Sequence, residues 1–203
     1  DAMAKPFIPD EFKDHKRLQE MAGVYVPFWM FDCDCQAMIT YNAQNITKWS
    51  DSDYDYTRTD YYRLLRGGNV SYMNIPVDAS LKANDAYMDA LEPFNYSKAV
   101  NFNAGYLSGH LADKYDVSVE DSIGRANKRV EQSTTDIFRD TVKGYTIVTP
   151  EFTNVQTSQG IVRYSLLPVW MLNIKYGGQN YNYAVNGQTG KVVGEYPIDK
   201  RKQ

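Results

Sequence analysis

Two acidic side chains and two thiols alternate in one short stretch, which reads "FDCDC" from Phe31 to Cys35. If this stretch is a strand, Asp32 and Asp34 share one face, because side chains alternate along a strand. The thiols of Cys33 and Cys35 then share the opposite face. Paired carboxylates can bind a cation or act as acid and base. A charged face in contact with solvent explains the same pattern, so both interpretations stay open.

The thiols lack the remaining ligands of a metal site. A zinc site needs about four ligands, and the histidines, His15 and His110, lie far away in sequence. A disulfide between Cys33 and Cys35 would distort an extended backbone severely. We therefore expect free, unliganded thiols in a reducing compartment, with no metal and no cofactor.

Tyrosines and arginines alternate in a second stretch, "YDYTRTDYYR". In a strand, Tyr54, Tyr56 and Arg58 share one face, while Tyr61 and Arg63 share the other. Such a ladder can bind a peptide or a sugar, yet packing across strands explains it equally well. We take these five residues as the candidate partner-binding set.

Catalytic signatures are absent from the sequence. No Ser, His and Asp set is apparent, so we assign no catalytic residue and favour a protein without enzymatic activity. The string "NGQTGKVVGE" contains Gly-Lys, but Gly187 and Gly190 are too close for a phosphate-binding loop, and Val192 stands where that loop has a hydroxyl.

Composition and charge further limit the classes of function and fold that the chain can have. The chain has 203 residues, a net charge of -3 and a pI near 5.4, which disfavour nucleic-acid binding by this segment. Its 17 tyrosines favour half-buried strands. No apolar run in the chain reaches the roughly 20 residues that a membrane-spanning helix requires.

The candidate residues must be positioned by helices and strands, and the sequence patterns of these elements predict an α+β fold in one compact unit. A helix over residues 9–23 followed by antiparallel strands accounts for residues 1–79, with a turn at "SDSD" and a reversal at Gly67 and Gly68. Helical patterns dominate residues 80–144, including segments around His110 and from Ser118 to Gly144. Antiparallel strands return over residues 145–203.

One string occurs twice, as "PFWM" at Pro27 to Met30 and as "PVWM" at Pro168 to Met171. Each copy begins a strand-like segment after a helical one, which suggests an internal duplication. Chance recurrence of a good strand sequence is the alternative. In either case the residues that we expect in the structural core are Pro27, Trp29, Pro168 and Trp170.

Two resemblances add context. The stretch from Ala184 to Glu195, with its "TGKV" turn, resembles the terminal β-hairpin of PepSY domains, which implies a small helix-plus-sheet module. The strings "GVYVPFWMFDCD", "WSDSDYDYTRTDYYR", "IPVDASLKANDAYMDALEPF", "LPVWMLNIKY" and "NGQTGKVVGEYPID" resemble a family of Gram-positive bacterial proteins of unknown function. That family carries a TFIIB-type zinc ribbon before this region and membrane helices after it, and some members bear a primosomal helicase name.

These observations favour a non-catalytic interaction or sensor domain of a membrane-anchored bacterial protein. Its partner is expected to be a protein or a small ligand. The alternative is a metal-dependent or other enzyme module that uses Asp32 and Asp34 with Cys33 and Cys35. The basic residues at 200–202 suggest that a membrane span follows Gln203, which predicts a location at the cytoplasmic face of the membrane.

Overall fold

The computed structural model describes residues 21–158, 160–176 and 178–195. The predicted N-terminal helix, apart from its last residues, and the basic residues at 200–202 lie outside the described residues. The chain divides into two compact units. Unit 1 comprises Asp1–Trp29, Val77–Val119 and Tyr164–Gln203, and unit 2 comprises Met30–Pro76 and Glu120–Arg163.

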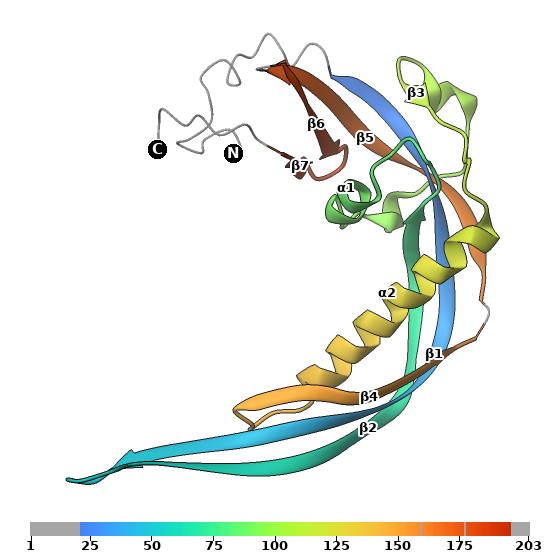
Figure 1. The fold of residues 1–203 in the computed structure, drawn as a ribbon. Coiled ribbons are helices and arrows are strands. Elements are labelled where there is room, and N and C mark those ends of the chain that lie inside the picture. The colour runs from blue at the N-terminus through green and yellow to red at the C-terminus, as the bar shows by residue number, and fades with distance from the viewer. Residues whose placement is uncertain (1–20, 159, 177, 196–203) are drawn as a thin grey trace. The chain divides into compact units, whose positions relative to one another are not determined.

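Long antiparallel strands dominate the described residues (Figure 1). The strands run in the order β2-β1-β5-β6-β7, and β3 and β4 also pair with β1. Their bounds are β1 Ala22–Ser50, β2 Asp55–Asp78, β3 Leu111–Ala112, β4 Ile147–Thr157, β5 Val162–Tyr176, β6 Gln179–Asn186 and β7 Val192–Gly194. The helices are α1 Asp85–Ala90 and α2 Val119–Asp140, with 3₁₀ turns at Tyr96–Lys98 and Ala104–Leu107.

Unit 2 is built on the hairpin of β1 and β2. Along β1, alternate residues from Cys35 to Ala43 are buried and the residues between them are exposed or half-buried, as expected for a sheet covered on one face. The edge strand β4 pairs antiparallel with β1, from Cys35 opposite Thr157 to Gln44 opposite Ile147. Beyond that pairing the hairpin continues as two strands alone.

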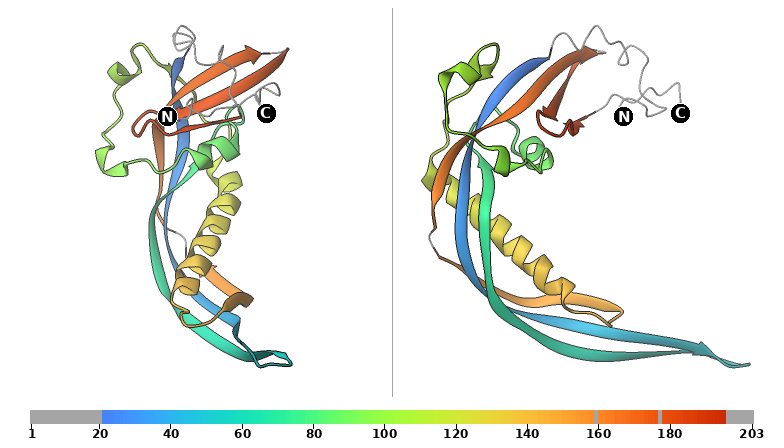
Figure 2. Two further views of the ribbon diagram at one scale, coloured as in Figure 1. Left: turned by 90° about the vertical axis from the view of Figure 1, so that its left-hand side faces the viewer. Right: turned by 180° about the vertical axis from the view of Figure 1, so that it is seen from behind.

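Helix α2 lies along the buried face of this sheet (Figure 2). Its small and apolar residues recur every four positions, so they form one buried stripe of Ser122, Ala126, Val130 and Thr134. Past the end of the helix, Val142 joins Ile39 and Tyr41 in a buried cluster. The Tyr41 hydroxyl donates to the Thr135 carbonyl at 3.1 Å, which fixes the helix to the strand.

Unit 1 has its own core. Phe28 of β1 packs against Phe94, with ring centroids 6.3 Å apart, and Met88 and Leu91 of the α1 region are fully buried. The amide of Asn186, at the end of β6, is buried and donates to the carbonyls of Leu91 and Pro93. A side-chain amide thus satisfies backbone groups that would otherwise be buried without partners.

The expected α+β class is wrong, because the fold is largely β. Strands take up 53% of the described residues and helical segments 20%. The predicted reversal at Gly67 and Gly68 does not occur, since β2 runs through both glycines. A side chain at Gly67 would lie 3.5 Å from the Ala37 carbonyl oxygen, and one at Gly68 would lie 3.6 Å from the Phe138 ring. Both distances are ordinary van der Waals contacts, so the neighbours do not require glycine at either position, and the strand simply continues through both residues.

The helix predicted around His110 is also absent. A 3₁₀ turn at Ala104–Leu107 leads into the short strand β3, and both His110 and Leu111 are exposed. A helix here would have no apolar face to bury, and β3 instead pairs parallel with the distant residues Val24 and Tyr25 of β1. The long helix predicted from Ser118 to Gly144 is confirmed as α2, which spans Val119–Asp140.

The expected membrane partner is corrected as well. Among the described residues, no helix is long and apolar enough to cross a membrane. The expected membrane partner therefore has no spanning helix among the described residues.

Candidate functional site

The structure places the alternating residues of "FDCDC" in β1 within unit 2. The carboxylate of Asp32 accepts two hydrogen bonds from Arg163 Nη2, each at 2.7 Å. It also accepts the backbone N–H of Asn74 at 2.7 Å. Partial burial opposes ionisation of Asp32, but these hydrogen bonds and the charge of Arg163 outweigh it and lower the pKa of Asp32. The ionised carboxylate therefore joins β1, β2 and the start of β5.

The other three residues of this stretch are also engaged or shielded. The hydroxyl of Ser71 donates to Asp34 at 2.5 Å. On the opposite face, Cys35 is buried and its Sγ lies 3.5 Å from the Thr134 hydroxyl. Burial, together with the nearby Cys35 and aspartates, raises the pKa of the Cys33 thiol, so that thiol stays protonated at neutral pH. A protonated thiol is a poor nucleophile.

This arrangement favours a structural role over acid–base or metal chemistry. Asp32 and Asp34 do lie apart from the two thiols across the strand, as the alternation predicts, but each carboxylate contacts a different neighbour on β2 or β5. Within the residues that the structure describes, no three His, Cys, Asp or Glu side chains come together as a possible metal site. The enzyme alternative therefore gains no geometric support.

The end of the β1–β2 hairpin carries a cluster of three exposed aromatic rings, those of Trp49, Tyr54 and Tyr56. We call these three residues, together with Asp51 in the turn between them, the hairpin tip. The rings of Trp49 and Tyr56 stack with centroids 5.3 Å apart and planes inclined by 10°. The Tyr54 ring meets Tyr56 edge-on at 6.3 Å. Trp49 is 49% exposed and Tyr54 is 69% exposed. Large aromatic rings are thus ordered against each other and still open to solvent.

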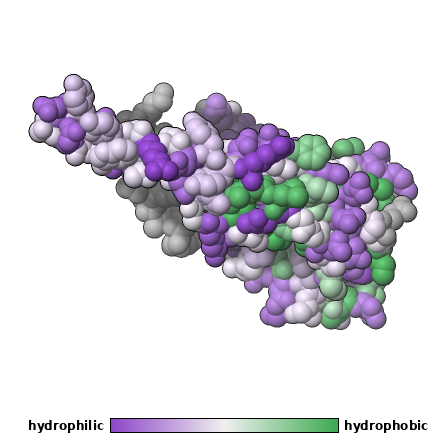
Figure 3. Space-filling view, turned by 90° about the horizontal axis from the view of Figure 1, so that it is seen from below, coloured by the Kyte–Doolittle hydropathy of each residue, from purple (hydrophilic) through white to green (hydrophobic). Residues whose placement is uncertain are grey.

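One carboxylate organises the hairpin tip. Asp51 accepts the backbone N–H groups of Asp53 and Tyr54 and the hydroxyl of Tyr56, at 2.9, 2.8 and 2.8 Å. These hydrogen bonds lower the pKa of Asp51, and the bond to Asp51 raises the pKa of the Tyr56 hydroxyl. The hairpin tip and the strands beside it show hydrophilic and neutral colours at the left of Figure 3. The rings of the hairpin tip are thus exposed to solvent at the end of this hairpin.

The rest of the predicted ladder spreads along β2. Arg58 forms an exposed ion pair with Asp60 at 3.0 Å. Arg63 reaches Glu151 on β4 at 2.9 Å. Tyr61 is 74% exposed. Of the five residues predicted to bind a partner, only Tyr54 and Tyr56 belong to the hairpin tip.

The expected core tryptophans have different surroundings in unit 1. Trp29 is half-buried, donates its Nε1–H to the Val117 carbonyl at 3.0 Å, and contacts the rings of Tyr115 and Tyr164. Trp170 is 39% exposed and meets the ring of His110, so it is not a core residue. The nearby prolines fit the core expectation better, since Pro27 is buried and Pro168 is half-buried.

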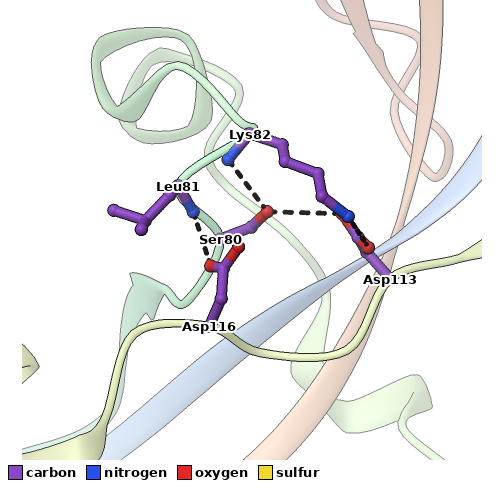
Figure 4. Close-up of polar contacts among 5 residues, drawn as sticks. All are labelled: Ser80, Leu81, Lys82, Asp113 and Asp116. Carbon is purple, nitrogen blue, oxygen red and sulfur yellow. Dashed lines mark hydrogen bonds and ion pairs between the residues drawn. The ribbon is translucent and has the colours of Figure 1, made fainter.

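A polar junction in unit 1 fixes the chain after β2 (Figure 4). Lys82 forms an ion pair with Asp113 at 2.7 Å, and Asp116 accepts the Leu81 N–H at 2.7 Å. The bond to Asp113 raises the pKa of Lys82. Because the carboxylates of Asp113 and Asp116 both hold chain segments in place, we read this junction as structural.

Sequence reasoning missed several contacts of these sites. Trp49 was detectable, because a turn at "SDSD" places Trp49 opposite Tyr56 in the hairpin. Arg163 and Asn74 were not, since they contact Asp32 from positions 131 and 42 residues away in the chain.

Comparisons with known proteins give one relative. The chain is 36% identical over 194 residues to a Bacillus subtilis (strain 168) protein described as "Uncharacterized protein YdjG". The match covers 96% of this chain and 57% of that protein, so the chain spans little more than half of the relative's length. No family model and no solved structure match the chain. The resemblances to zinc-ribbon proteins and to PepSY domains stay predictions.

Proposed function

We propose that the chain is a non-catalytic interaction module and that the hairpin tip binds a protein partner. The observation that carries this proposal is the exposed stack of Trp49 on Tyr56, with Tyr54 beside it. Aromatic rings supply much of the binding energy at protein interfaces, because they bury a large area and have few rotatable bonds to immobilise.

Preorganisation supports the same interpretation. The three hydrogen bonds accepted by Asp51 fix the turn and the Tyr56 ring before any partner arrives. A surface that is already ordered loses less entropy on binding. Asp51, Asp53 and Asp55 give the turn beside the rings three acidic residues. The partner segment is therefore expected to carry lysine or arginine side chains that pair with carboxylates and lie on aromatic faces.

A displayed peptide library selected on the purified chain tests the proposal. We expect the selected peptides to be rich in arginine and lysine, and to lose at least tenfold in affinity for Trp49→Ala. Lys128→Ala, on the exposed face of α2, is the matched control and should bind as the wild type does. Selected peptides that bind Trp49→Ala as tightly as the wild type would contradict the proposal.

A further inference from the structure

Strand β2 lies at the edge of the sheet. Among the described residues it pairs with β1 alone, although it is 24 residues long. The backbone N–H and C=O groups on the open side of an edge strand can pair with another strand. The β1–β2 hairpin extends past α2 and β4 towards the hairpin tip (Figure 1), and the β1–β4 pairing ends at Gln44 opposite Ile147.

The turn determines which residues present their backbone to this open edge. The Asp51 N–H donates to the Tyr54 carbonyl, and hydrogen-bonded pairs recur every second residue along an antiparallel ladder. The even-numbered residues of β2 therefore face β1, and odd-numbered residues such as Thr59 face the open edge. The Leu65 carbonyl fits this alternation, because the Arg66 guanidinium donates to it at 3.0 Å.

The side chains along this edge are complementary to the same side chains of a second copy of β2. If two copies of β2 pair antiparallel about Thr59, Arg58 of one copy lies opposite Asp60 of the other, and the two-fold axis repeats the contact. The remaining facing pairs are Asp55 with Arg63, Tyr56 with Tyr62, and Thr57 with Tyr61. Opposite charges and aromatic pairs are the combinations that stabilise neighbouring strands.

The adjacent registers lack this property. A shift of the two-fold centre by one residue along each strand places Arg58 opposite Arg58 of the second copy, or Asp60 opposite Asp60. Like charges directly opposite each other destabilise a sheet. A register centred between two residues would set outward-facing backbone groups against inward-facing ones, so the alternation excludes it.

We propose that β2 pairs edge to edge with β2 of a second copy of this chain, centred on Thr59, and so forms a symmetric dimer. The proposal goes beyond the interaction module, because it rests on the backbone edge and the charges of β2, although Tyr56 belongs both to this edge and to the hairpin tip. The ion pairs within one copy do not prevent it. Arg58 with Asp60 and Arg63 with Glu151 are exposed pairs, which contribute little and can be exchanged at small cost.

A charge swap tests the dimer by sedimentation equilibrium. We expect the wild type to dimerise reversibly, and Arg58→Asp and Asp60→Arg each to weaken dimerisation about tenfold, because each variant places like charges opposite each other twice. An equimolar mixture of the two variants restores opposite charges at both positions, so it should form heterodimers as tight as the wild-type dimer. The control Lys128→Asp should leave dimerisation unchanged.

Recovery in the mixture also shows that both variants are folded. A wild type that stays monomeric up to about 1 mM, single variants that dimerise as the wild type does, or a mixture that stays monomeric would each overturn the proposal. None of these results bears on the peptides selected by the hairpin tip. The two proposals therefore fail independently.

Discussion

Replacing Asp32 by alanine is expected to destabilise unit 2 by about 2–3 kcal/mol. The change removes the acceptor of the Asn74 N–H, a half-buried group whose loss of a partner costs about 1–3 kcal/mol. It also removes the ion pair with Arg163. That guanidinium side chain is 43% exposed, so solvent screening limits this second contribution to about 0.5 kcal/mol.

Asp32→Asn separates the two contributions. The asparagine keeps an oxygen that can accept the Asn74 N–H but loses the charge, so we expect a cost of about 1 kcal/mol. Urea unfolding followed by circular dichroism at pH 7 measures both variants. Arg163→Met, alone and combined with each Asp32 variant, completes a double-mutant cycle.

The stabilising charge also has a predicted pH dependence. The pKa of Asp32 is lowered in the folded chain from its ordinary value of 3.8. The unfolded chain therefore binds the proton more readily, and the stability from ionised Asp32 is complete above about pH 5 and is lost as pH falls through 3.8 and then through the folded-state value. The difference between the wild type and Asp32→Asn should shrink over that range. Equal costs for the alanine and asparagine variants, or a constant difference down to pH 2, would refute the reasoning.

Three further perturbations test the packing and the thiols. Ile39→Ala should cost about 3 kcal/mol in urea unfolding, because Ile39 is fully buried against Tyr41 and Val142, and a cost below about 1 kcal/mol would contradict that packing. Trp29→Ala should cost about 3 kcal/mol but Trp170→Ala only about 1 kcal/mol, since Trp170 is 39% exposed whereas Trp29 is half-buried and donates a hydrogen bond to the Val117 carbonyl. The reverse order would be inconsistent with their surroundings. Cys33 and Cys35 should be alkylated much more slowly in the folded chain at pH 7.5 than after unfolding, because burial raises the pKa of Cys33 and shields Cys35 from the reagent. If the wild type instead retains stoichiometric zinc that Cys33→Ser loses, the thiols bind a metal.

The sequence predicts those parts of the fold that depend on local patterns. The turn at "SDSD" and helix α2 appear where the spacing places them, because turn residues and an i, i+4 stripe act over a few residues. Gly67 and Gly68 led to a wrong prediction, since a pair of glycines permits a reversal without requiring one, and β2 continues through both residues. The cytoplasmic location stays a prediction.

In the candidate site, too, the sequence predicts what depends on neighbouring residues and not what depends on residues distant in the chain. Alternation along β1 correctly separates the aspartates from the thiols, but only the fold brings Arg163 to Asp32 and Ser71 to Asp34. These contacts, an ion pair at Asp32 and a hydrogen bond at Asp34, give a possible catalytic pair a structural role. Asp51 shows the opposite case, because its partners Asp53, Tyr54 and Tyr56 are all within five residues.

The division of the chain between its two units has a consequence for synthesis on the ribosome. Unit 1 draws on three separate segments, and its last one begins at Tyr164, after all of unit 2 has been made. The first strand of unit 1 must therefore wait, unpaired with β5, until more than 130 residues have followed Trp29. Unit 2 is complete at Arg163 and can fold earlier. Because exposed strands that await distant partners are prone to aggregate, a pause in translation before β5 should lower the yield of folded protein more than an equal pause within α2.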